Sequence, residues 1–296
     1  MTARSIAAAA IAEFLGRPLR GTPSPIFRPS QLDLCGPGDI VWIRSFTPER
    51  VALVETRRPA LVICDAGTAD RLTVPHVVCD RPRLAFIRVT AAFFAEDEPI
   101  GIHPTALIDA GATLGEDVSV GAYTRIGAGV RIGAGCRIAS GVSLEGQVRL
   151  GRRCRIKANS VIGAPGFGFE RDEQGVPIHF PHLGDVVLED DVWLGACTTI
   201  ERAALGTTRL CQGVKVDDLV QIGHNVVLGR NTLVMSNAVI CGGTVVGERC
   251  WIAPNSVIKE KLRIGDDVTV ALGAVVLKNV EPGQVVAGVP AKPLAR

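Results

Sequence analysis

The chain has 296 residues, with 32 Lys and Arg against 30 Asp and Glu and no long basic run, so we expect no nucleic-acid partner. No apolar stretch reaches the roughly 18 residues that a membrane span needs, so we expect no membrane span. The nine cysteines are scattered, odd in number and never spaced as C-x-x-C, which predicts reduced thiols in a cytoplasmic protein with no disulfide framework and no metal site.

Residues 1–98 predict a small α/β domain. Residues 5–15 are typical of a short helix that Gly16 ends, and residues 84–95 predict a second helix. Between them lie three short apolar runs, at 40–43, 60–64 and 74–79, which predict strands. The acidic run at 96–98, followed by Pro99, marks the expected boundary of this domain.

The rest of the chain is dominated by a repeat of six residues. Every sixth residue from Ile102 to Ile162 is aliphatic, and a second unbroken series runs from Leu210 to Val276. Neither a period of 2 nor one of 3.6 produces this pattern. It is typical of hexapeptide repeats, in which three hexads form one triangular coil and strands stack in parallel from coil to coil. Similarity to known hexapeptide-repeat coils implies left-handed winding, an exception to the usual right-handed crossover.

We therefore predict a left-handed parallel β-helix over residues 99–280, followed by a C-terminal tail at 281–296. The residue after each aliphatic is often Gly, as at Gly115, Gly195 and Gly223, and we expect these glycines to help form the tight corners.

Two insertions interrupt the repeat. Residues 163–187 form the longer one, and residues 201–209 add four positions. An insertion in a solenoid leaves as a loop on one face, often the binding face. Three phenylalanines in the longer loop, Phe167, Phe169 and Phe180, predict burial against a neighbour or a ligand; the alternative is a tolerated surface loop.

Four stretches resemble one enzyme family. They are IAEFLG (11–16) with PGDI (37–40), GAPGFGF (163–169), LGACTTIERAAL (194–205) and VDDLVQIGHNVVLG (216–229). Together they are similar to the UDP-3-O-acylglucosamine N-acyltransferase family of lipid A biosynthesis, in the same order over nearly the whole chain. The resemblance implies a homotrimer with active sites between neighbouring prisms. It also implies transfer of an acyl group from a thioester to the amine of a nucleotide-linked amino sugar, with no bound cofactor.

The same resemblance implies that His224, in the segment QIGHN, is the catalytic histidine. It further implies that a backbone amide one coil on helps bind the thioester oxygen. Gly242 follows His224 by 18 residues, so the length of one coil independently places it beside His224. A neutral imidazole, with an ordinary pKa near 6.5, can deprotonate a sugar ammonium at neutral pH. A fixed N–H can then stabilise the oxyanion.

Other residues are candidates for substrate binding. Asp217 and Asp218 lie in the hexad before His224 and could orient it or bind the sugar; the alternative is a pair of solvated corner acids. Phe167, Phe169 and His182 lie in the longer loop and could contact the acceptor. For His182, an ordinary loop residue is the alternative.

The chain departs from the family pattern in its N-terminal domain and at the donor site. After PGDI, Trp42 keeps the aromatic platform of the uracil clamp, while Ser45 and Pro48 replace its Asn and Tyr. Lys261 stands where the family has a second histidine that binds the donor's carrier arm, and Lys could serve a phosphate there. The identity of the nucleotide is therefore open.

The ending also departs from the family. It reads GVPAK at 288–292, as in coenzyme A-dependent sugar acetyltransferases, where the family has a helix that meets acyl carrier protein. The donor is therefore open between acyl carrier protein and acyl- or acetyl-coenzyme A. Two other functions stay open, a sugar O-acetyltransferase that uses acetyl-coenzyme A and a noncatalytic trimeric scaffold. The spacing of His224 and Gly242 favours an enzyme.

Overall fold

The computed structural model describes residues 5–95 and 100–294. The chain divides into two compact units, Met1–Glu98 and Pro99–Arg296. The acidic run expected at their boundary lies outside the described residues. Among the residues that are described, no helix combines the length and the apolar content that crossing a bilayer requires.

The N-terminal unit is an α/β domain built on a five-stranded sheet of order β1-β5-β4-β3-β2 within residues 5–95. Its strands β2 to β5 run parallel and β1 pairs antiparallel with β5. The strand bounds are Leu19–Arg20 (β1), Arg28–Pro29 (β2), Asp39–Trp42 (β3), Leu61–Cys64 (β4) and His76–Val78 (β5). The three predicted apolar runs correspond to β3, β4 and β5.

Four α-helices accompany this sheet in the described residues. Their bounds are Ala8–Phe14 (α1), Pro48–Arg57 (α2), Ala66–Ala69 (α3) and Pro82–Phe93 (α4), and a short 3₁₀ turn spans Leu32–Leu34. Helices α1 and α4 correspond to the two predicted helices. Helix α2 was not predicted, and it explains Pro48: the fixed φ of proline suits the first helical position, where Thr47 caps the helix by accepting the Arg50 N–H.

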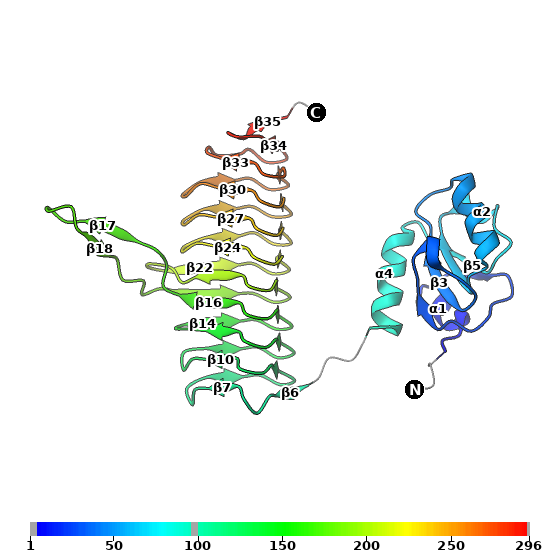
Figure 1. The fold of residues 1–296 in the computed structure, drawn as a ribbon, viewed down its shortest axis with the longest axis horizontal. Coiled ribbons are helices and arrows are strands. Elements are labelled where there is room, and N and C mark those ends of the chain that lie inside the picture. The colour runs from blue at the N-terminus through cyan, green and yellow to red at the C-terminus, as the bar shows by residue number, and fades with distance from the viewer. Residues whose placement is uncertain (1–4, 96–99, 295–296) are drawn as a thin grey trace. The chain divides into compact units, whose positions relative to one another are not determined.

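The C-terminal unit is a parallel β-helix (Figure 1). Within residues 100–294, its nine-stranded sheet consists of β7 (Leu107–Ile108), β10 (Arg125–Ile126), β13 (Ser143–Leu144), β16 (Val161–Ala164), β21 (Thr199–Glu201), β24 (Gln221–Ile222), β27 (Val239–Ile240), β30 (Val257–Ile258) and β33 (Val275–Val276). The eight-stranded sheet consists of β8 (Thr113–Leu114), β11 (Arg131–Ile132), β14 (Val148–Leu150), β19 (Asp185–Leu188), β22 (Thr207–Leu210), β25 (Val227–Leu228), β28 (Val245–Val246) and β31 (Arg263–Ile264).

The third face is an eleven-stranded sheet. It consists of β6 (Gly101–Ile102), β9 (Ser119–Val120), β12 (Arg137–Ile138), β15 (Arg155–Ile156), β20 (Trp193–Leu194), β23 (Lys215–Val216), β26 (Leu233–Val234), β29 (Trp251–Ile252), β32 (Thr269–Val270), β34 (Val285–Ala287) and β35 (Lys292–Pro293). The hexad aliphatics fill the interior together with the residues two positions before them, as Ile132 and Val130 do. The hand of the coil stays a prediction.

The corners are made by a different position than we predicted. The third residue after most of the aliphatics adopts the left-handed conformation, and it is often Asn or Gly, as at Asn225, with φ of 61°. The glycines directly after the aliphatic serve another purpose. A Cβ on Gly195 would lie 2.2 Å from the carbonyl carbon of Asp217 in the next coil. Gly115, Gly195 and Gly223 are therefore required by the close approach of neighbouring coils.

The longer insertion is shorter than predicted. Strand β16 continues to Ala164 and β19 begins at Asp185, because β19 pairs in parallel with β14. The loop thus spans residues 165–184. It carries an antiparallel hairpin, β17 (Phe169–Arg171) and β18 (Pro177–His179), which projects away from the prism (Figure 1).

The predicted tail is part of the β-helix. Strand β34 adds to β32 in parallel, and β35 folds back antiparallel on β34. Ala291 packs against the prism core, while the Val275 N–H donates to the Gly288 carbonyl. The boundary at 280 was therefore wrong, because Val286 still belongs to the buried ladder and the residues after it close the last coil.

Candidate active site

His224 lies on the corner where β24 of the nine-stranded sheet leads into β25 of the eight-stranded sheet; we call this the His224 corner. The preceding coil holds it in two places. The backbone N–H of His224 donates to a carboxylate oxygen of Glu201 at 3.1 Å, and that of Asn225 donates to the Thr208 hydroxyl at 2.8 Å. These two hydrogen bonds to the preceding coil therefore fix the backbone that carries the imidazole.

Asn225 determines which nitrogen of His224 carries the proton. Its Oδ1 accepts the Ala204 N–H at 3.0 Å, and its Nδ2 donates to the Leu205 carbonyl at 2.7 Å, so the amide has one orientation. The same Oδ1 lies 3.0 Å from His224 Nδ1. Because that oxygen only accepts, Nδ1 must donate, and Nε2 of the neutral ring carries the free lone pair. The geometry thus provides a base at Nε2.

Gly242 lies directly beside that base. A Cβ at residue 242 would lie 2.6 Å from His224 Nε2, so only glycine fits here without displacing the ring. The two coils are joined next to it, where the Gly243 N–H donates to the His224 carbonyl at 2.8 Å. None of the hydrogen bonds among the described residues uses the Gly242 N–H, so the residue beside Nε2 has a free backbone donor.

Lys261 shares the His224 corner, two coils further on. Its backbone N–H donates to the Gly242 carbonyl at 2.9 Å, and its exposed side chain extends past Gly243. Neighbouring strands are spaced about 4.8 Å apart, so Lys261 lies about 10 Å along the corner from His224. A phosphate on a donor arm that runs along the corner could reach it.

The longer loop approaches the site through His182. A series of ring contacts links it to His224: Phe167 to Phe169 at 4.8 Å, Phe169 to His179 at 5.2 Å, His179 to His182 at 5.8 Å and His182 to His224 at 5.1 Å between centroids. We predicted that His182 could contact the acceptor. In the single chain its side chain is only 5% exposed. Phe167 is 85% exposed in the single chain, so its burial against a neighbour or a ligand stays a prediction.

Asp217 and Asp218 lie at a different corner, after β23 of the eleven-stranded sheet. One oxygen of Asp218 accepts from Lys157 Nζ at 2.6 Å and from the Ala196 N–H at 2.7 Å. The ammonium of Lys157 holds the Asp218 pKa below its usual range. Among the described residues, no hydrogen bond or ion pair joins either acid to His224, so neither orients that ring within one chain; the acid that contacts His224 is Glu201.

In the N-terminal unit, Trp42 lines a cavity of about 600 Å³. Phe86 forms part of the same wall, with its ring centroid 6.5 Å from that of Trp42, and Arg44 and Arg50 supply guanidinium groups. Arg50 also donates to the carbonyl and hydroxyl of Ser45, one of the two replaced clamp residues. An aromatic wall with hydrogen-bond donors can hold a flat heterocycle.

Two protein-family models of hexapeptide repeats match the β-helix unit. The model described as bacterial transferase hexapeptide (six repeats) matches residues 99–134, 129–164 and 243–278, and that described as hexapeptide repeat of succinyl-transferase matches 219–260. The UDP-3-O-acylglucosamine N-acyltransferase of Bordetella pertussis is 40% identical over 228 residues, covering 69% of this chain. That of Coxiella burnetii is 37% identical over 267 residues, covering 83% of this chain. The chain belongs to the UDP-3-O-acylglucosamine N-acyltransferase family.

The alignment covers a different share of each relative's own length. The alignment spans 63% of the Bordetella pertussis protein and 78% of the Coxiella burnetii protein. Solved structures agree in fold. The UDP-N-acetylglucosamine acyltransferase of Campylobacter jejuni has a TM-score of 0.61 at 22% identity, covering 66% of this chain and 74% of that one. The enzyme of the same name from Francisella novicida has a TM-score of 0.60 at 22% identity, covering 66% and 70%.

Sequence reasoning missed two functional neighbours of His224 in this family member. Asn225 follows His224 directly, and Glu201 lies in the segment TTIERAAL that helped identify the family. The adjacent Asn was a usable signal, because Asn is favoured at left-handed corners and can also accept from an imidazole. Glu201 was harder to find, since the second insertion shifts the repeat just after it.

Proposed function

We propose that this chain is an N-acyltransferase that moves an acyl group from a thioester to the amine of a nucleotide-linked amino sugar. One observation carries the proposal: Asn225 fixes the proton of His224 on Nδ1, and the free Nε2 lies beside the unused N–H of Gly242. A base and an oxyanion donor are the two groups that aminolysis of a thioester needs. The name shared by the relatives supports the amino-sugar acceptor.

In this mechanism, His224 Nε2 takes a proton from the sugar ammonium and passes it to solvent, which returns the imidazole to its neutral form. The free amine attacks the thioester carbon, a C–N bond forms, and the Gly242 N–H stabilises the oxyanion. A second proton moves from the nitrogen to Nε2 as the intermediate collapses. The C–S bond then breaks, and the thiolate leaves as a thiol with a proton from the imidazolium. No cofactor takes part; the thioester is a co-substrate.

The substrates would be arranged around the His224 corner. The acceptor's sugar would contact Phe167 and Phe169, and the Trp42 cavity of the N-terminal unit is by itself a candidate site for a nucleotide. Asp217 and Asp218 would reach the sugar from a neighbouring chain, because they lie at another corner of their own prism. The donor's phosphorylated arm would run past Lys261, and it would belong to acyl carrier protein or to coenzyme A.

We further infer a homotrimer of left-handed prisms in the cytoplasm. The left-handed hand follows from the hexapeptide repeats, whose known coils wind that way. Six successive outward residues in the coils at and after His224, distributed over all three faces, are apolar, which supports contact between prisms. They are Val227, Leu233, Val239, Val245, Trp251 and Val257.

Replacing His224 by Ala tests the proposal. We expect turnover to fall by at least about a hundredfold, because general-base catalysis contributes roughly 10²–10⁴-fold. The matched control is His103→Ala, which removes an exposed histidine from the first coil of the same unit. Both variants should elute in size-exclusion chromatography like the unmodified protein. Unchanged turnover in His224→Ala would refute the mechanism.

The donor and the acceptor atom are determined in the same assay. Purified protein is offered acyl chains of two lengths, each as the acyl-carrier-protein and the coenzyme A thioester, together with nucleotide-linked amino sugars. Mass spectrometry of the product distinguishes an amide from an ester, and an ester would indicate the O-acetyltransferase alternative. Absence of turnover with every coenzyme A thioester would exclude that donor.

A further inference from the structure

The longer loop is built around a single buried imidazole. His182 is 5% exposed, and the residues after it are tied to the second insertion: the Leu183 N–H donates to the Ala204 carbonyl at 2.9 Å and the Gly184 N–H to that of Ala203 at 3.0 Å. His182 is therefore anchored to the prism next to the His224 corner. The hairpin beyond it is exposed, with Phe167 at its base 85% exposed.

Two glycines of the GAPGFGF motif make room for this ring. A Cβ on Gly166 would lie 2.9 Å from His182 Nε2, and one on Gly168 would lie 2.9 Å from its Cε1. Neither glycine has a positive φ, so backbone conformation does not explain them. Gly168 is required by the space that the His182 ring occupies. Gly166 is required by that ring and by Glu201, whose Oε2 would lie 2.6 Å from a Cβ there.

The ring has a defined protonation and orientation. Its Nδ1 lies 2.8 Å from the Phe180 carbonyl, which only accepts, so Nδ1 carries the proton. Its Nε2 is then a buried acceptor that has no partner in the part of the chain the structure describes. Such a group is costly to bury unless the fold needs it there. Its ring lies at 77° to that of His224, with 5.1 Å between the centroids.

We infer that His182 is a positioning residue for His224, which holds the catalytic imidazole in the plane that directs Nε2 toward Gly242. Asn225 restrains the ring at one atom, and a single hydrogen bond leaves the imidazole free to tilt about it. The ring of His182 packs against it and restricts that tilt. The inference rests on the proposed function, and it gives the inserted loop a role in alignment.

His182 faces Glu201 across Gly166, and the rings of His224 and His179 lie on its two sides. The buried ring therefore fills the space between the longer loop and the His224 corner. Removing it would leave the His224 ring without a packing partner on that side.

The experiment compares His182→Ala, which removes the ring, with His182→Phe, which keeps a packed ring that cannot titrate. We expect His182→Ala to lower kcat about ten- to a hundredfold, since a small misplacement of a catalytic group can cost that much, with KM nearly unchanged. His182→Phe should restore most of kcat. The control is His179→Ala, which removes the exposed imidazole on the other side of His182.

A readout without substrate accompanies the kinetics. The chain has five histidines, so imidazole ¹⁵N resonances of histidine-labelled protein can be assigned by single substitutions. His182→Ala should shift and broaden the His224 signals, while His179→Ala should leave them in place. Unchanged kcat and unchanged His224 signals in His182→Ala would overturn the inference. Loss of turnover in His224→Ala alongside such a result would leave the proposed function standing.

Discussion

At the scale of single residues, Asn225 performs several tasks at once. It adopts the left-handed conformation that turns the corner, with φ of 61°. Its backbone N–H donates to Thr208, its Nδ2 donates to Leu205, and its Oδ1 accepts from both Ala204 and His224. An aspartate could accept these bonds but could not donate to the Leu205 carbonyl. The residue type therefore follows from the chemistry of the site as well as from the corner.

Gly242→Ala is the sharpest test of the space beside Nε2. The new Cβ would lie 2.6 Å from that nitrogen, so the imidazole must tilt away from the thioester. Gly242 does not have a positive φ, so the backbone should accept Ala without strain. We expect kcat to fall about a hundredfold, as a displacement of about 1 Å can cause, while the melting temperature changes little. Cys241→Ala, one residue earlier on the same corner, is the control and should retain turnover.

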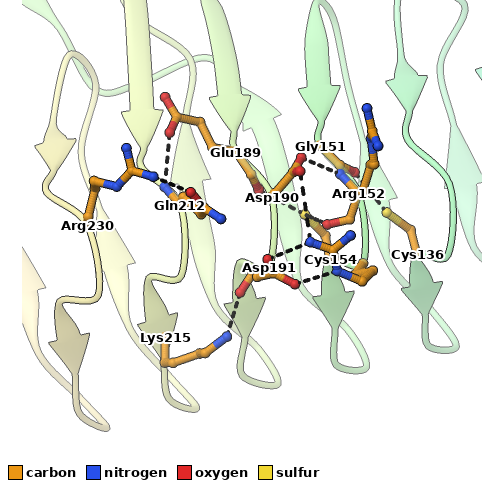
Figure 2. Close-up of polar contacts among 11 residues, drawn as sticks. Cys136, Gly151, Arg152, Cys154, Glu189, Asp190, Asp191, Gln212, Lys215 and Arg230 are labelled. Atoms are coloured by element: carbon orange, nitrogen blue, oxygen red, sulfur yellow. Dashed lines mark hydrogen bonds and ion pairs between the residues drawn. The ribbon is translucent and has the colours of Figure 1, made fainter.

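At the scale of elements, charged residues stack along the corner between the eight- and eleven-stranded sheets. Both oxygens of Asp191 accept from Arg153 in the coil below, at 2.7 Å each, and Asp267 pairs in the same way with Arg249. Figure 2 shows Asp191 between two coils, with Lys215 donating to its carbonyl. These pairs connect coils at positions with positive φ.

The Arg153–Asp191 pair predicts a pH-dependent contribution to stability. The guanidinium holds the Asp191 pKa below its ordinary value of 3.8. A carboxyl whose pKa is lower in the folded state stabilises the fold above the unfolded pKa and loses that effect as the pH falls through the folded pKa. At pH 7, Asp191→Asn should lower the free energy of unfolding by about 0.2–1 kcal/mol, as usual for exposed pairs. Urea denaturation should show this difference shrinking between pH 4 and 3; an equal difference at both would contradict the assignment.

The β-helix could be predicted from sequence because the burial of aliphatic side chains that produces it recurs at a fixed spacing. Each aliphatic such as Ile126 must enter the prism every sixth residue, and the structure confirms the β-helix. Contacts across the insertions could not be predicted in this way. Glu201 and His182 meet His224 only because the two insertions fold against each other, through backbone hydrogen bonds that leave no period in the sequence.

At the scale of the whole β-helix unit, the outward residues change in character along the prism. From 125 to 155, five of the six outward residues are arginines, namely Arg125, Arg131, Arg137, Arg149 and Arg155. From Val227 to Val257 they are all apolar, on all three faces. Such a contiguous apolar band usually marks a surface that contacts another protein. The band lies at the level of His224 and Gly242, where the proposed active site between prisms would need contact.

The double variant Val239→Lys and Val257→Lys tests that assembly. Both residues face outward from the nine-stranded sheet, and two buried ammonium groups without partners would oppose association. We expect light scattering after size-exclusion chromatography to show monomers where the unmodified protein forms trimers, with loss of turnover. Ser143→Lys, which faces outward from the same sheet in an early coil, is the control and should remain trimeric. A monomeric unmodified protein would contradict the trimer itself, whereas a trimeric double variant with full turnover would place the interface on another face. In either case, His224→Ala alone would still test whether turnover requires His224 Nε2 as the base.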